Sequence, residues 1–175
     1  MTSKELRSLI KEEVRNEMDN FHDMNVMKNT HKSNIIKSLD TFTLMYIDVA
    51  LSTSFDNADD SGGEPLNRNY AIEDIEYETL EKMIKDCKSF QEKCGELYNS
   101  AGWNDGHAGY DFWLTRNGHG TGFWDRDSST LFNTELFQQY GEEGIEKVGE
   151  KLTTASKSYG EYSLYAEDGI IYGYP

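Results

Sequence analysis

The spacing of apolar residues changes once along this chain of 175 residues, and that change constrains the fold more than any other feature. Before residue 100 the apolar side chains recur every three or four positions, which is the repeat of an amphipathic α-helix. Residues 77–100 show it most clearly, with the stripe Leu80, Met83, Ile84, Cys87, Phe90, Cys94 and Leu97. After Gly102 the repeat shortens to two positions, as in a β-strand. The sequence therefore predicts helices first and strands afterwards.

The same helical repeat predicts three further helices. They are expected over residues 1–24, 33–52 and 144–159. The polar stretch 24–33 is expected to be a hinge between the first two. Residues 54–69 are rich in Asp, Asn, Ser and Gly, which favour turns and loops.

Short strands are expected in the second half of the chain. Residues 110–115 alternate and 123–126 would return as their partner, joined by the glycine-rich turn 117–122. A second hairpin is expected over 162–174, because its central Asp-Gly pair is a strong hairpin signal. The predicted fold class is α+β, with three to four helices packed on a small antiparallel sheet of about four strands.

Charge divides the chain into two predicted parts. Residues 1–32 hold six basic and six acidic residues, whereas 33–175 hold 11 basic and 26 acidic residues, which accounts for the whole net charge of −15. We expect an N-terminal amphipathic arm followed by an acidic α+β domain. So much negative charge argues against direct binding of nucleic acid and of anionic membrane surfaces.

The sequence favours a cytoplasmic protein. It has no apolar run long enough to cross a bilayer, and charged residues interrupt the first 12 positions where a signal peptide would need an apolar core. Cys87 and Cys94 lie two helical turns apart, too far for a disulfide, so two buried free thiols are expected.

One run of the sequence is distinctive: Tyr110-Asp-Phe-Trp-Leu-Thr-Arg-Asn-Gly-His-Gly-Thr-Gly-Phe-Trp-Asp-Arg126. It resembles the signature of a family of small acidic proteins encoded by bacteriophages, plasmids and some bacterial genomes. The resemblance extends over roughly residues 40–175. It implies a mobile-element protein made inside a bacterial host cell, and it implies no particular reaction.

This run concentrates polar residues that suit a site. They are Asp111, Arg116, Asn117, His119, Asp125 and Arg126. His119 is a candidate catalytic acid or base near neutral pH, and the two arginines would contact an anionic group. The alternative is a scaffold, in which the glycines form a tight turn and the carboxylates pair with the arginines across strands.

No cofactor or metal is expected. His107 and His119 with nearby aspartates fit no zinc spacing. The acidic loop after residue 55 lacks the spacing and the closing glutamate of a helix–loop–helix calcium site.

A run of carboxylates is the second candidate feature. It comprises Asp56, Asp59, Asp60, Glu64, Glu73, Asp74, Glu76 and Glu78. These residues either keep the protein dispersed in solution or form a surface that binds a basic groove of a host protein in place of nucleic acid.

The leading functional prediction is an accessory protein that binds and modulates or inhibits a host protein through this surface. Two alternatives stay open. One is an enzyme or small-ligand-binding domain that uses residues 110–126. The other is a virion or replisome interaction protein that docks, or forms a homo-oligomer, through residues 1–24.

Overall fold

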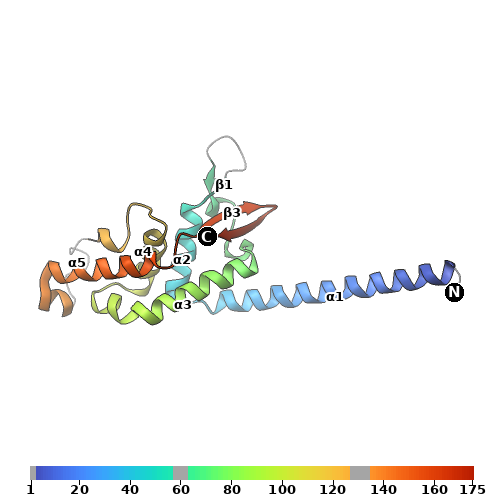
Figure 1. The fold of residues 1–175 in the computed structure, drawn as a ribbon, viewed down its shortest axis with the longest axis horizontal. Helices are drawn as coiled ribbons and strands as arrows, with labels where there is room; N and C mark the ends of the chain where they lie inside the picture. The colour runs from blue at the N-terminus through green and yellow to red at the C-terminus, as the bar shows by residue number, and fades with distance from the viewer. Residues whose placement is uncertain (1–2, 57–62, 127–134) are drawn as a thin grey trace. The chain divides into compact units, whose positions relative to one another are not determined.

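The computed structural model describes residues 3–56, 63–126 and 135–175, which form two compact units, Met1–Ser38 and Leu39–Pro175. The first unit is a single helix, α1 (Ser3–Lys37), coloured blue in Figure 1. The expected hinge at 24–33 is wrong, because α1 continues through it. That stretch contains no Gly or Pro, and polar side chains on the surface of a helix do not end it.

The second unit begins with α2 (Thr41–Thr53). The single helix predicted over 33–52 is therefore divided at residues 38–40. Asp40 caps the new helix, since its Oδ1 atom accepts a hydrogen bond from the Thr43 amide at 2.7 Å. Because the apolar repeat continues through residues 38–40, the sequence does not reveal this break between the two helices.

The helix predicted over residues 77–100 is confirmed as α3 (Tyr77–Ser100). Glu76 caps its start by accepting from the Thr79 amide at 2.8 Å. Cys87 and Cys94 lie on this helix as buried free thiols. Burial raises the pKa of both thiols, so both stay protonated and unreactive at neutral pH.

The strand predicted at 110–115 is wrong: these residues belong to a helix, α4 (Asp105–Arg116). Asn104 caps it by accepting from the His107 amide at 2.9 Å. Residues 111–116 are all buried, so both sides of the apparent alternation face protein. A helix buried on every side carries no amphipathic repeat, and the period of two was coincidental.

The predicted return strand at 123–126 is also wrong. Phe123–Asp125 form a 3₁₀ helix, η3. Three glycines of the preceding loop have positive φ, at positions 118, 120 and 122. Helix α5 (Glu135–Lys157) follows and is interrupted at Gly141, where φ is 66°. Its second part agrees with the helix predicted over 144–159.

The described strands form two separate antiparallel pairs and not one sheet of four. In the first, β1 (Phe55–Asp56) pairs with β2 (Glu64–Pro65). In the second, β3 (Ser163–Glu167) pairs with β4 (Ile170–Tyr174), which confirms the predicted C-terminal hairpin. Its Asp-Gly turn has positive φ at both residues, 51° and 80°, as a type I′ turn requires.

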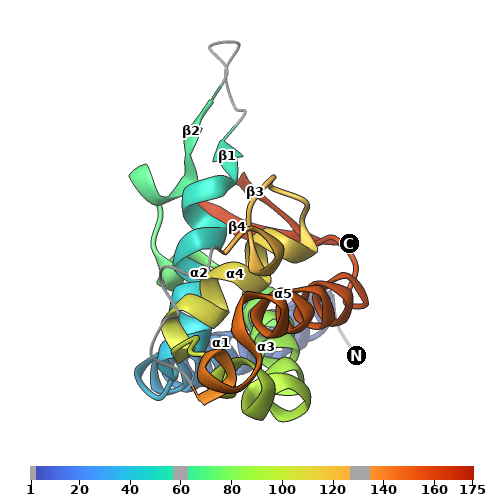
Figure 2. The ribbon, with the colours of Figure 1, turned by 90° about the vertical axis from the view of Figure 1, so that its left-hand side faces the viewer.

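The two strand pairs lie near one another at one end of α2, where β1 contacts β3 (Figure 2). Between the pairs, the chain passes through two 3₁₀ turns, η1 (Leu66–Arg68) and η2 (Ile72–Asp74), before α3. The class is therefore α+β, with far more helix than strand.

Aromatic rings fill the core where α2, α3 and α4 meet. The rings of Phe90 and Phe112 stack with centroids 4.2 Å apart, and Phe42 packs against both. Helices α2 and α4 approach closely because residue 109 is glycine: a Cβ there would lie 2.1 Å from the Phe42 carbonyl oxygen.

Within the described residues, no helix combines the length and apolar character needed to cross a bilayer.

Candidate functional site

The six residues predicted to form a site do not meet at one place. Asp111 and Arg126 form a partly buried ion pair, Arg116 lies in the core, and Asp125 is exposed on η3. Only Asn117 and His119 line a common surface pocket. The predicted convergence depended on paired strands, and the helix α4 instead points successive side chains in different directions.

Asp111 and Arg126 are engaged with each other. The Arg126 Nε atom donates to both Asp111 oxygens, at 3.1 and 2.9 Å, and its Nη2 atom completes a forked contact. Asp111 is fully buried and also accepts from the Trp103 indole at 2.9 Å. The carboxylate raises the pKa of Arg126 mainly through these hydrogen bonds. The pair ties the loop after α4 to the helix itself.

Arg116 is a buried connector between elements. Its Nη1 atom donates to the Tyr46 hydroxyl at 2.7 Å and to Asp86 at 3.0 Å. Its Nε and Nη2 atoms donate to the carbonyls of Gly160 and Tyr159. With 3% of the residue exposed, this guanidinium does not reach a ligand at the surface.

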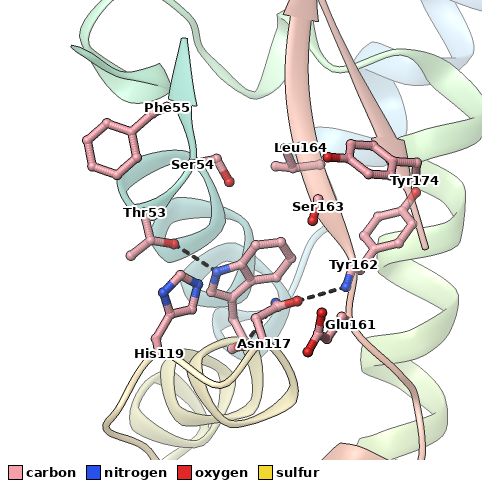
Figure 3. A pocket seen from close by; sticks show the side chains of 11 residues that line it. Thr53, Ser54, Phe55, Asn117, His119, Glu161, Tyr162, Ser163, Leu164 and Tyr174 are labelled. Atoms are coloured by element: carbon pink, nitrogen blue, oxygen red, sulfur yellow. Dashed lines mark hydrogen bonds between the residues drawn. The ribbon is translucent and has the colours of Figure 1, made fainter. Parts of the chain in front are cut away.

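Asn117 ends α4 and joins it to the C-terminal hairpin. Its Nδ2 atom donates to the Trp113 carbonyl at 3.1 Å, and its Oδ1 atom accepts from the Tyr162 amide at 2.7 Å. Trp113 in turn donates from its indole to the Thr53 hydroxyl at 2.8 Å. These bonds hold together the ends of α2 and α4 and the chain entering β3, as Figure 3 shows.

The place where these ends meet is a pocket of about 450 Å³. We call it the α2–α4–hairpin pocket, and it is lined by Thr53, Ser54, Phe55, Trp113, Asn117, His119, Glu161, Tyr162, Ser163, Leu164 and Tyr174. Figure 3 shows Phe55 and His119 on one side, with Tyr162 and Tyr174 on the other. Its size falls within the range of small-molecule sites, which is about 300–1,000 Å³.

Three ionisable groups decide the electrostatics of this pocket. His119 is exposed at the pocket rim, and partial desolvation of its ring lowers its pKa, so the ring is mainly neutral at pH 7. Burial raises the pKa of Tyr162, whose hydroxyl therefore also stays neutral. Glu161 is exposed at the pocket and supplies a carboxylate. The pocket is consequently polar and negative at neutral pH.

The polar lining divides into engaged and unengaged groups. Thr53 and Asn117 are occupied by the hydrogen bonds described above. By contrast, the side chains of Ser54, His119, Glu161 and Ser163 make no hydrogen bond to another described residue. These four are the groups that a ligand could contact without displacing a structural bond.

The predicted acidic surface is only partly described. Asp59 and Asp60 lie outside the described residues. Glu64, Glu73 and Glu78 are exposed. Asp56, Asp74 and Glu76 are half-buried, and each has a local contact: Asp56 accepts from the Tyr70 hydroxyl, Asp74 from the Ala71 amide and Glu76 from the Thr79 amide.

No group of three or more His, Cys, Asp or Glu residues in the described part of the chain could hold a metal ion. No family model, no curated protein and no solved structure matches the chain. The resemblance drawn from residues 110–126 therefore stays a prediction.

Sequence reasoning missed most of the pocket. Asn117 and His119 were singled out, but Phe55, Glu161 and Tyr174 were not, although they line the same pocket. These positions are about 35 to 55 residues from the signature in either direction. The packing of α2 against α4 brings Phe55 to the pocket, and the contacts of the C-terminal hairpin with β1 and Asn117 bring Glu161 and Tyr174. No local pattern could have found them.

Proposed function

We propose that this chain is a phage- or plasmid-encoded accessory protein that acts in the host cytoplasm by binding a basic host protein. The binding surface would be the acidic segment between β2 and the start of α3. Carboxylates there would occupy a groove that normally contacts nucleic-acid phosphates, and the protein would modulate or inhibit its partner. The observation that carries the proposal is the distribution of charge.

That charge belongs entirely to the second unit. Residues 39–175 hold ten basic and 26 acidic residues, whereas residues 1–38 hold seven basic and six acidic residues. Two of the ten cations, Arg116 and Arg126, are used in internal ion pairs. A field of this sign and size accelerates association with basic partners and repels nucleic acid itself.

Within the described residues, three exposed carboxylates are the centre of the proposed surface: Glu64, Glu73 and Glu78. Asp74 and Glu76 are less suitable as contacts because they are half-buried. Only one cation, Arg68, lies between Glu64 and Glu78.

The experiment compares two triple variants with the same change of charge. In the test variant, Glu64, Glu73 and Glu78 are each replaced by Lys; in the control, Glu92, Glu96 and Glu146 are. Each protein is immobilised and exposed to bacterial proteins that bind DNA–cellulose. We expect the parent and the control to retain a partner that duplex DNA or about 0.5 M salt releases, because salt screens exposed charges.

The test variant should lose that partner while keeping its melting temperature. Equal capture by both triple variants, or capture that neither salt nor DNA reverses, would refute the nucleic-acid-mimicking surface. The enzyme alternative loses its predicted anion contacts, since Arg116 and Arg126 are both committed to internal carboxylates.

A second candidate function rests on α1. Val14, Met18 and Phe21 follow one another at spacings of four and three, and these residues are 49%, 67% and 63% exposed. An exposed apolar stripe of this kind marks a protein contact. We propose that it pairs with the α1 helix of a second copy, the homo-oligomer predicted for residues 1–24.

The charges beside the stripe favour pairing with a second copy of α1 and favour a parallel orientation of the two helices. Lys11 and Arg15 lie on one flank of the stripe, and Glu13 and Glu17 lie on the other. When two helices pair in parallel, opposite flanks face each other, so basic residues meet acidic ones. Antiparallel pairing would bring like charges together.

Sedimentation of the full chain tests the pairing. Met18→Glu should dissociate the oligomer, whereas Met27→Glu, a methionine of similar exposure (72%) on the other side of the helix, should not. Val14→Cys and Phe21→Cys should each form an interchain disulfide. A parallel pair allows both, because each residue then faces the same residue of the second copy. A monomeric parent would refute the pairing and leave docking on a virion or replisome protein.

A further inference from the structure

The geometry points to the α2–α4–hairpin pocket as a binding site for a guanidinium or ammonium group, with Glu161 as its counter-ion and Phe55 and Tyr174 as its aromatic walls. This inference does not depend on the proposed protein partner, because a free organic cation would bind the protein alone. The inferred ligand is a cation, whereas the sequence predicted contacts with an anionic group.

The positive charge of the preferred ligand follows from the residues that line the pocket. None of the eleven described lining residues is Lys or Arg, and Glu161 is the only carboxylate among them. His119 adds no positive charge at neutral pH, because partial burial lowers its pKa. Surrounded by a strongly acidic domain, such a pocket attracts cations and excludes phosphates and carboxylates.

The walls suit a cation as well. Phe55 and Tyr174 are 49% and 51% exposed although both are large aromatic residues, and they lie across the pocket from one another in Figure 3. Rings placed in this way attract ammonium and guanidinium groups through their negative faces. This gives a reason for two half-exposed rings at the same opening.

Hydrogen bonding completes the fit. A guanidinium presents five N–H donors and no acceptor. The Glu161 carboxylate and the hydroxyls of Ser54 and Ser163 accept hydrogen bonds, and none of the three is engaged with another described residue. A bidentate contact between a guanidinium and a carboxylate is among the stronger polar interactions in proteins.

The probes are agmatine, which carries both a guanidinium and an ammonium group, the uncharged butylurea, and the blocked peptide acetyl-Gly-Arg-Gly-amide. Each is titrated into the full chain and followed by amide shifts in NMR and by calorimetry. We expect agmatine to shift the amides of Ser163 and His119 and to bind at least about tenfold more tightly than butylurea. Tighter binding of agmatine than of the peptide would indicate a free amine as the natural source of the cation, and the reverse would indicate a protein side chain.

Matched variants separate the site from general charge. Glu161→Gln should weaken agmatine about tenfold, whereas Glu167→Gln, the same change at an exposed position on β3, should not. Phe55→Ala should also weaken agmatine binding, and it should leave the melting temperature unchanged. Agmatine affinity should also fall as the pH drops below about 6.5, because the His119 ring becomes charged in the pocket that Glu161, Tyr162 and Tyr174 also line.

Three outcomes would overturn the inference. They are equal binding of agmatine and butylurea, equal losses in Glu161→Gln and Glu167→Gln, and an absence of shifts at the pocket at millimolar agmatine. None of them bears on the acidic surface between β2 and α3, so the inference and the proposed function fail separately.

Discussion

Arg116 on α4 donates to Asp86 on α3 across 3.0 Å, and 1% of the arginine side chain and 11% of the aspartate side chain are exposed. Around this ion pair, Arg116 also holds the Tyr46 hydroxyl on α2 and two carbonyls that follow α5. One side chain of the predicted site thus fastens four parts of the domain together.

The first prediction concerns this connector. Removing one partner of a buried ion pair costs about 3–5 kcal/mol. Without Arg116, the half-exposed Lys82 would be the counter-ion left to Asp86 among the described residues. We expect Arg116→Met to lower the free energy of unfolding by about that amount in urea denaturation. Arg68→Met, at an exposed position, should change it by less than about 0.5 kcal/mol. Similar values for the two would show that Arg116 is not a structural residue.

The second prediction concerns the other internal pair. Asp111→Asn should destabilise the domain by about 3 kcal/mol, because Arg126 and the Trp103 indole then lose a buried carboxylate. Asp125→Asn is the matched control, since Asp125 is exposed one position before Arg126. Thermal melts and urea midpoints of both variants test this. A larger loss in Asp125→Asn would contradict the assignment.

The third prediction concerns close packing of α2 and α4. Gly109→Ala places a Cβ about 2.1 Å from the Phe42 carbonyl oxygen, a backbone atom that cannot move aside alone. We expect a loss of at least about 3 kcal/mol, or failure to fold. Gly95→Ala, in the middle of α3 with 3.9 Å to the nearest atom, should instead stabilise the protein by up to about 1 kcal/mol. Equal effects would contradict the close approach.

The fourth prediction concerns pH. Burial lowers the pKa of His119 in the folded protein, so the unfolded chain takes up a proton at a higher pH than the folded chain. The contribution of His119 to stability is therefore complete above about pH 6.5 and decreases as the pH falls toward the folded pKa.

NMR titration of the His119 ring should place its midpoint below about 6.5. The variant His119→Asn should lose less stability than the parent between pH 7.5 and pH 5.5, measured by urea denaturation at both values. A midpoint at or above the ordinary histidine value would contradict the partial desolvation of this ring.

Elements whose signals are local could be predicted from the sequence. The apolar stripe of α3 and the Asp-Gly turn of the C-terminal hairpin were predicted within one or two residues. In both elements one face is buried and the other is exposed to solvent, so the spacing of apolar residues reflects the secondary structure. The acidic character of the second unit follows from composition alone.

Tertiary packing decided the rest. Residues 111–116 belong to a helix that shows no amphipathic repeat, because the aromatic cluster and the close approach at Gly109 bury this segment on all sides. The same packing turned Arg116 inward, and together with the contacts of the C-terminal hairpin it placed Phe55, Glu161 and Tyr174 around one pocket with His119. A site assembled from distant segments depends on which helices meet, and long-range contacts of that kind leave no trace in the spacing of nearby residues.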